Sequence, residues 1–287
     1  MAAGREIKKK IGSIQNTKKV TSAMQMVAAS KMRRTQQRMH AARPYAHRLR
    51  QIIGHLASAR PEYTHQYMTD PEEVKRISYI VISTDKGQCG GLNANLFRAL
   101  LKDINLWQQQ SVQADLAILG NKAITFFRSV GGNVKAAIPD IGELPEIEPL
   151  IGGLKIVFDE FVDNTVQRVN LVSNTFVNSM TQRPHVRQLL PLSKSDDLQT
   201  THSWDYIYEP EASVLIEGLV QRYIESQVYQ AVIENVACEQ SARMIAMKNA
   251  TDNAAAMIDD LNLLYNNVRQ ASITQEIAEI VGGAAAI

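Results

Sequence analysis

The stretch of this sequence that most resembles a binding or catalytic motif is the glycine-rich "STDKGQCGGLNANL", which begins at Ser83. A turn of this kind between a strand and a helix can bind phosphate through its backbone amides. However, Gly87, Gly90 and Gly91 fit neither the GxGxxG spacing nor the GxxxxGK[ST] spacing of nucleotide-binding loops. We therefore expect a structural turn in which Asn93 caps the following helix.

Other residue types that could do chemistry are not arranged as a site. His40, His47 and His55 are seven and eight residues apart, which on a helix is roughly 10 to 12 Å per step and too far for one metal ion. Asp196 and Asp197 lie in the polar stretch "SKSDDLQT", which is typical of a loop. The sequence predicts no catalytic set, no cofactor and no metal site.

The two cysteines, Cys89 and Cys238, fit no CxxC spacing. We expect both to be passive thiols in a reducing, intracellular setting. The sequence has no apolar run of 18 residues, and its N-terminus lacks the apolar core of a secretory signal. We therefore expect a soluble chain with no membrane anchor of its own.

Positive charge is concentrated at the N-terminus. Residues 1–60 contain 14 Lys and Arg but one acid, Glu6, which gives a net charge of +13 within a chain of net charge +2. Such a basic, amphipathic segment fits a nucleic-acid-binding arm, a membrane-surface helix, a mitochondrial transit peptide or one half of a charged helix pair. Composition alone does not choose among these four.

Both ends of the chain are predicted to be long helices, because no proline precedes Pro44 and none follows Pro210. Pro44 is a place where the first helix could bend, and Pro210 suits the first turn of the second. Apolar residues recur at helical spacing in both segments. In the first they are Ile7, Ile11, Ile14, Val20, Met24, Val27, Met32 and Met39, and in the second Leu215, Leu219, Tyr223, Met244, Met247, Met257, Leu261, Leu264 and Val268.

The two helices are expected to pair as an antiparallel coiled coil, because residues 211–287 carry ten acids and four bases opposite the basic N-terminus. When their inner ends are aligned near residues 57 and 211, the first helix ends opposite about residue 267. The last 20 or so residues, roughly 30 Å of helix, must then extend without a partner from this chain. Their apolar residues, Ile273, Ile277, Ile280 and Ala284, lie on a different helix face from Val268.

Strand-like and helical segments alternate between the two ends. "RISYIVIST", "ADLAILG", "NVKAAIP", "RVNLVSNTF" and "HVRQLLPL" are typical of strands, and helical patterns follow the first three of them. This alternation predicts a mostly parallel sheet covered by helices. The predicted fold class is α/β, with a long antiparallel coiled coil and an inserted Rossmann-like domain. The predicted domains are a coiled-coil helix at 1–59, the α/β domain at 74–195 and a second coiled-coil helix at 207–287.

Several stretches of this sequence resemble the gamma subunit of bacterial F-type ATP synthase, most closely its proteobacterial members. They are "EIKKKIGSIQNTKKVTSAMQMVAASKM", the glycine-rich turn, "SWDYIYEP", "ESQVYQAVIENVACEQSARMIAMKNATDNA" and "RQASITQEIAEIVGGAAA". The last contains the specific pattern I-T-x-E-x-x-[DE]-x-x-x-G-A, from Ile273 to Ala284. The resemblance disfavours a transit peptide.

This resemblance implies a rotor subunit without catalytic residues of its own. The coiled coil would turn inside a ring of three alpha and three beta subunits, and its foot, together with an epsilon subunit, would sit on a membrane ring of c subunits. Rotation driven by ion flow would change the nucleotide affinity of each beta subunit in turn. The chain would bind no nucleic acid, and it would meet the cytoplasmic face of the bacterial inner membrane only through the complex.

The resemblance also implies functional positions. Met24 matches a position that faces an acidic loop of the beta subunit. Residues implied to contact the alpha and beta subunits from the C-terminal helix are Arg243, Gln270, Thr274 and Glu276, and those implied at the foot are Tyr206, Tyr208 and Glu209. Gln88 and Ala278 depart from the family pattern, which has Leu and often Thr at these positions.

Two other interpretations stay open from the residues alone. One is an α/β nucleotide-binding enzyme with a basic arm for membrane or nucleic acid, which the absence of a standard phosphate motif disfavours. The other is the central stalk of a vacuolar-type ATPase, which would leave the inserted α/β segment unexplained.

Overall fold

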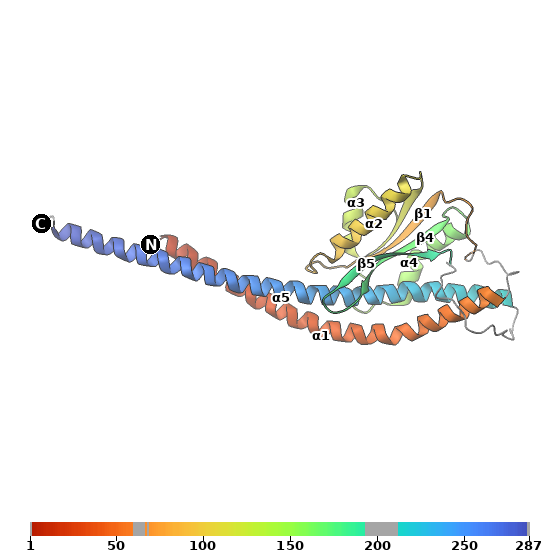
Figure 1. Cartoon of the computed structure of the whole chain (residues 1–287), viewed down its shortest axis with the longest axis horizontal. Coiled ribbons are helices and arrows are strands. Elements are labelled where there is room, and N and C mark those ends of the chain that lie inside the picture. Colours follow the sequence, from red (N-terminus) through yellow and green to blue (C-terminus); the bar gives the residue numbers. More distant parts are fainter. Residues whose placement is uncertain (1, 60–66, 68, 193–211, 286–287) are drawn as a thin grey trace. The chain divides into compact units, whose positions relative to one another are not determined.

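Two long helices and a five-stranded sheet make up the structure (Figure 1). The computed structural model describes residues 2–59, 67, 69–192 and 212–285. The N-terminal helix α1 (Ala2–Ala59) continues through Pro44 as one helix, and the C-terminal helix α5 (Ala212–Ala285) is 74 residues long. The prediction of a long helix at each end is confirmed, whereas Pro210 lies outside the described residues.

The sheet has the mostly parallel order that the alternating pattern predicted. Its strands lie in the order β3-β2-β1-β4-β5, in which β1 to β4 are parallel and β5 is antiparallel to β4. Their bounds are β1 Arg76–Ile82, β2 Gln113–Leu119, β3 Asn133–Ile138, β4 Arg168–Phe176 and β5 Gln182–Leu190. All residues of β1 after Arg76 are buried, as expected for a central strand covered on both faces.

Helices cover both faces of this sheet (Figure 1). The helix α2 (Leu92–Gln108) and the helix α3 (Asn121–Val130) pack on one face, around Tyr79 and Leu116. The other face is covered by α4 (Ile147–Val162) together with α5. The last helix therefore completes the core of the α/β domain. The predicted fold class is confirmed, and the domain limits 1–59, 74–195 and 207–287 stay predictions.

By compactness the chain divides into two units, each of which includes part of both long helices. Unit 1 consists of residues 1–30 and 243–287, and unit 2 consists of residues 31–242. Unit 1 is the antiparallel pair formed by the start of α1 and the end of α5, and unit 2 contains the sheet. Each is described by itself below.

A buried serine joins the carboxyl ends of β1 and β2 in unit 2. The hydroxyl of Ser83 donates to the carbonyl oxygens of Leu119 and Gly120, at 3.0 and 3.2 Å, and it accepts from the amide of Ala123 at 3.0 Å. Gly120 has φ +93°, and a Cβ atom there would lie 2.7 Å from both the carbonyl oxygen and the Oγ of Ser83. Only glycine fits here without moving the backbone.

We expect Gly120→Ala to lower the free energy of unfolding by roughly 3 kcal/mol, through backbone strain and loss of the Ser83 hydrogen bonds. Gly131→Ala is the matched control: Gly131 also has positive φ, +83°, but nothing lies within 4 Å of an added Cβ. Its cost should be about 1 kcal/mol. Urea unfolding of the full chain, followed by tryptophan fluorescence, measures both. Equal losses would contradict the role assigned to the Ser83 contact.

Candidate partner-binding surface

The seam of unit 1 follows a strict alternation of three-residue and four-residue steps along α1. Its buried or half-buried positions are Gly4, Ile7, Ile11, Ile14, Lys18, Thr21, Gln25 and Ala28. The matching positions of α5 are Met247, Thr251, Ala254, Ile258, Leu261, Tyr265, Val268 and Ser272. This heptad spacing is that of two helices packed as a coiled coil.

Polar and small side chains make up much of this seam. The hydroxyls of Thr21 and Thr251 form a hydrogen bond of 2.8 Å, and Ala28 is only 1% exposed. Lys10, by contrast, is exposed and pairs with Glu6 of its own helix at 3.2 Å. Opposite net charge of the two helices therefore acts from the surface, while the seam itself is close packing of small and apolar groups.

The apolar positions predicted from the sequence are partly wrong, because four of them point to solvent. Val20 and Val27 are 58% and 54% exposed, and Met257 and Leu264 are 55% and 48% exposed. Thr21, Ala28 and Ala254 take their places in the seam. A pattern made only of large apolar residues had been read one position away from the true contact line. Unit 1 thus carries exposed apolar residues on both of its helices.

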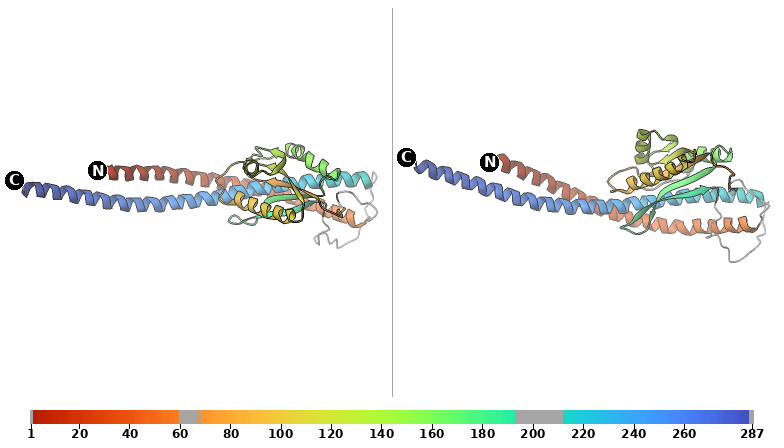
Figure 2. Two further views of the ribbon diagram at one scale, coloured as in Figure 1. Left: turned by 90° about the horizontal axis from the view of Figure 1, so that it is seen from above. Right: turned by 45° about the horizontal axis from the view of Figure 1, so that its top comes forward.

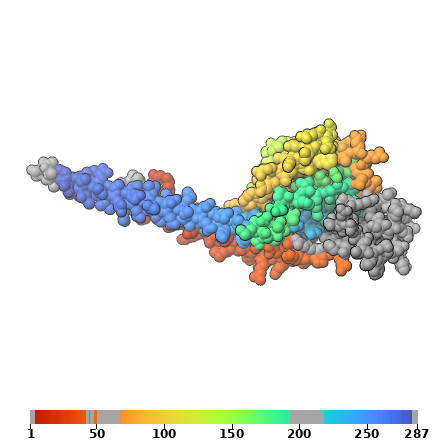
Figure 3. Space-filling view, in the orientation of Figure 1, coloured from red at the N-terminus to blue at the C-terminus, as the bar shows by residue number. Residues whose placement is uncertain are grey.

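The end of α5 extends past the start of α1, as the length argument predicted (Figure 2). A Cβ at Gly4 would lie 3.7 Å from the ring of Tyr265, which places the beginning of α1 opposite that residue. Ser272 is the last half-buried position, and residues 273–282 are all exposed. In the space-filling view the end of α5 is a single rod beyond the start of α1 (Figure 3). Its exposed apolar residues are Ile273, Ile277, Ile280 and Val281.

The predicted contact residues lie in or next to this surface. Met24 and Arg243 are half-buried, whereas Gln270, Thr274 and Glu276 are exposed. The side chain of Ala284 is not described, and the predicted foot residues Tyr206, Tyr208 and Glu209 lie outside the described residues. Whether these positions bind partners stays a prediction.

The glycine-rich turn is ordered by contacts within the chain. The hydroxyl of Thr84 donates to the carbonyl oxygen of Lys86 at 2.8 Å, and Asn93 donates to that hydroxyl at 2.7 Å. The predicted cap at Asn93 is wrong, because α2 has Gly91 at its N-cap position without a side-chain cap. The Asn93 side chain points back to the end of β1 instead. Gln88 has φ +64°, a left-handed backbone that few non-glycine residues adopt.

The usual ligand position of a doubly wound sheet is filled here by α5. In such folds the ligand binds at the carboxyl ends of the strands where the order reverses, here between β1 and β4. At this place Asn174, near the end of β4, donates to the Oδ1 of Asn235 at 2.9 Å. Asn235, on α5, donates in turn to the carbonyl oxygen of Ser83 at 3.2 Å. All three residues are buried.

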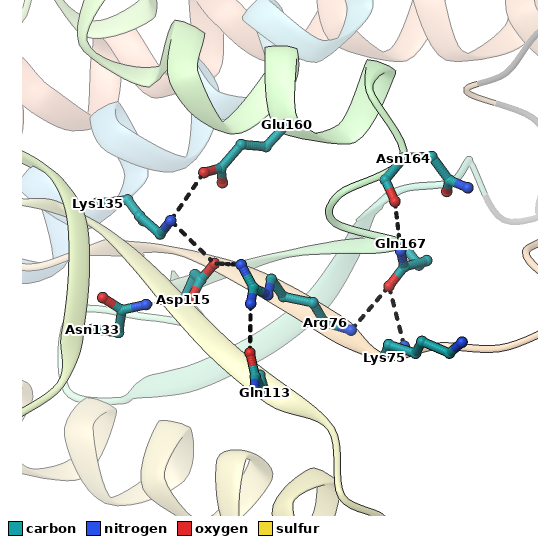
Figure 4. Close-up of polar contacts among 9 residues, drawn as sticks. All are labelled: Lys75, Arg76, Gln113, Asp115, Asn133, Lys135, Glu160, Asn164 and Gln167. Atoms are coloured by element: carbon teal, nitrogen blue, oxygen red, sulfur yellow. Dashed lines mark hydrogen bonds and ion pairs between the residues drawn. The ribbon is translucent and has the colours of Figure 1, made fainter.

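A charged cluster that the sequence did not suggest lies near the opposite ends of the strands (Figure 4). Asp115, whose side chain is 2% exposed, lies 3.7 Å from Arg76 and 3.9 Å from Lys135. Asn133 donates to its other oxygen at 2.7 Å, and Lys135 also pairs with Glu160 at 3.2 Å. Two acids and two bases balance, so the cluster ties β1, β2, β3 and α4 together without excess charge.

Groups that hold metals or cross membranes were also sought among the described residues. There, His, Cys, Asp and Glu side chains do not gather in threes where an ion could be held. No helix in this part of the chain combines the length and apolar character needed to cross a bilayer. Among the predicted loop and helix residues, His40 is exposed, and Asp196 and Asp197 are outside the described ranges.

Comparison with known proteins gives one family and several similar structures. A family model described as ATP synthase matches residues 3–287. A chain of the Euglena gracilis mitochondrial ATP synthase, from the structure of OSCP, F1 and c-ring in rotational state 3, is 20% identical. The alignment covers 99% of this chain and 94% of that one, with a TM-score of 0.69.

Two further structures share the fold. A chain from the rotor of the Euglena gracilis enzyme is 18% identical over 95% of this chain and 99% of its own length, with a TM-score of 0.63. A chain from the central stalk and c-ring of the Tetrahymena thermophila mitochondrial ATP synthase is 25% identical, with a TM-score of 0.59. That alignment covers 80% of this chain and 99% of the other.

The seam of unit 1 can be tested with two neighbouring residues. Ala28→Gln should lower the stability of the helix pair by about 2 kcal/mol, because a polar amide would have to enter a filled, buried position. Val27→Gln should change it by less than about 0.5 kcal/mol, because Val27 faces solvent. Thermal unfolding of the full chain, followed by circular dichroism, measures both. A larger loss for Val27→Gln would contradict the seam described above.

Proposed function

Because this chain belongs to the ATP synthase gamma-subunit family, we propose that its two units divide the work of a rotor. The chain is the central-stalk subunit that couples ion flow through a membrane c-ring to ATP synthesis or hydrolysis by rotation. Unit 1 would turn inside the ring of alpha and beta subunits, three of each. Unit 2 would carry the foot that meets the epsilon subunit and the c-ring. The observation that carries this division is the end of α5, which extends past α1 with exposed apolar residues.

The physical basis of coupling is the asymmetry of unit 1. Near its base two helices present Val20, Val27, Met257 and Leu264 to the surroundings, and at its tip one helix remains. A turning rod whose sides differ contacts each surrounding beta subunit differently. Such a rod shifts the conformational equilibrium of each beta subunit by its difference in contact free energy. No chemical step in the chain itself is needed, and we propose that the chain is non-catalytic.

Individual contacts follow from the family positions. Met24 would face an acidic loop of the beta subunit, and the surrounding basic helix would favour that approach. Arg243, Gln270, Thr274 and Glu276 would contact or brace against the alpha and beta subunits. Beyond them the small, uncharged end of α5 suits an apolar collar, in which charged side chains would resist turning.

The foot and the location of the complex complete the proposal. Tyr206, Tyr208 and Glu209 would meet the c-ring and the epsilon subunit. The sequence stretches that resemble proteobacterial members favour a peripheral position at the cytoplasmic face of the bacterial inner membrane. Membrane association would then come only through the complex.

Co-expression with alpha and beta subunits tests the proposed function. The chain should co-purify with them in a complex that hydrolyses ATP. It should also confer ATP-driven ion pumping on membranes that hold the remaining subunits. A chain that failed to co-purify and instead bound nucleotide alone would support the α/β nucleotide-binding enzyme and overturn the rotor.

Deletion of residues 273–287 tests the role of the tip. Folding should be spared, because the described residues of this segment lie exposed beyond the seam. The thermal unfolding midpoint of the full chain should therefore stay within about 2 °C of wild type, which corresponds to less than about 1 kcal/mol. The assembled complex should pump fewer ions per ATP, since the shaft has lost its seat. Loss of folded protein would contradict this account.

A further inference from the structure

Helix α5 is held in two different ways along its length. From Thr251 to Ser272 only one line of residues faces its partner helix. Between Ala231 and Ser241, by contrast, buried residues occur on all sides of the helix, including Val232, Asn235 and Cys238. In this second stretch α5 belongs to the core of unit 2 and is enclosed by it.

Directional contacts hold the enclosed stretch to three strands. Beside the link from Asn174 through Asn235 to Ser83, the amide of Phe176 donates to Glu234 at 3.0 Å. The thiol of Cys238 donates to the carbonyl oxygen of Asn174 at 3.4 Å. Arg187 of β5 donates to the carbonyl oxygen of Gln227 at 3.3 Å. We call these contacts between α5 and residues 83, 174, 176 and 187 the α5 clamp.

The α5 clamp fixes what apolar packing leaves free. Hydrophobic contact is non-directional, so a helix in an apolar groove can turn or slide at modest cost. A shift by one residue moves the helix 1.5 Å and turns it by 100°. Such a shift would separate Asn235 from both of its partners, and their polar atoms would remain buried without hydrogen bonds. Burial raises the pKa of the Cys238 thiol, which keeps its proton available for donation.

We propose that the α5 clamp is the element that transmits torque between the helical shaft and the α/β domain, and that Asn235 is its main positioning residue. The place where related sheet folds bind a ligand is used here to prevent α5 from turning against the sheet. The inference rests on the proposed rotor function. It assigns the α/β domain a mechanical task, because the predicted foot residues 206–209 lie in sequence between β5 and α5.

Asn235→Leu removes both hydrogen bonds of this residue while keeping a similar size. Assembled with the other subunits in membrane vesicles, the variant should hydrolyse ATP within about twofold of the wild-type rate, because unit 1 is unchanged. The number of ions pumped per ATP against an imposed gradient should fall at least about threefold, because α5 can turn without carrying the domain. A ratio equal to that of wild type overturns the proposal.

Tyr79→Phe is the matched control. It removes a buried hydrogen bond of 2.7 Å to Asp103 on the α2 face of the same sheet, so it weakens the domain without changing the α5 clamp. It should leave the ratio of ions to ATP unchanged, and an equal loss in both variants would overturn the proposal. If Asn235→Leu does not accumulate, Arg187→Gln decides the question: a reduced ratio supports the clamp and an unchanged one overturns it. Failure of the wild-type chain to assemble would instead overturn the proposed function.

Discussion

Helix α5 has to bury apolar side chains along most of its 74 residues, and it does so against two different partners. In unit 2 the partner is a sheet face, where Tyr223, Val228 and Val232 join the core with α4. In unit 1 the partner is α1, through a seam one residue wide at each turn. A single helix is thus both a core element of the α/β domain and half of a coiled coil. The rest of the architecture follows from this double use.

One consequence concerns the carboxyl edge of the sheet. A helix that completes the core next to β1 and β4 also reaches the point where the strand order reverses. The polar groups exposed there on Ser83 and Asn174 need hydrogen-bond partners once water is excluded. Asn235 of α5 provides them. The fold has thereby exchanged a ligand position for a rigid attachment, which is what a load-bearing subunit requires.

A second consequence concerns the surface of the shaft. Because small and hydroxyl side chains such as Ala28 and Thr21 fill the seam, larger apolar residues such as Val27 remain outside. A seam of this kind packs two helices closely while leaving contact surface for other subunits. Past Ser272 the helix has no partner in this chain, and its stability depends on helix propensity and on what surrounds it.

Much of the fold could be predicted from residue periodicity and from proline positions. Strands such as "RISYIVIST" are recognisable because both faces are buried, and the absence of proline after Pro210 marks the last helix. The overhang followed from helix lengths alone. The seam was harder to identify, because Lys18, Thr21 and Gln25 carry no apolar signal although they keep the three-four spacing. Asn93 and Asn235 were missed for a different reason: their partners, Thr84 and Asn174, are set by tertiary packing and leave no local pattern.

The most direct test of the account is whether the α/β domain turns with the shaft while ATP is hydrolysed. Both native cysteines are buried, so a bead can be attached selectively at Gln109→Cys, an exposed position just after α2. In a surface-fixed complex with alpha and beta subunits, the account predicts stepwise rotation of the bead in one direction on addition of ATP. Hydrolysis at a normal rate with a stationary bead would contradict it.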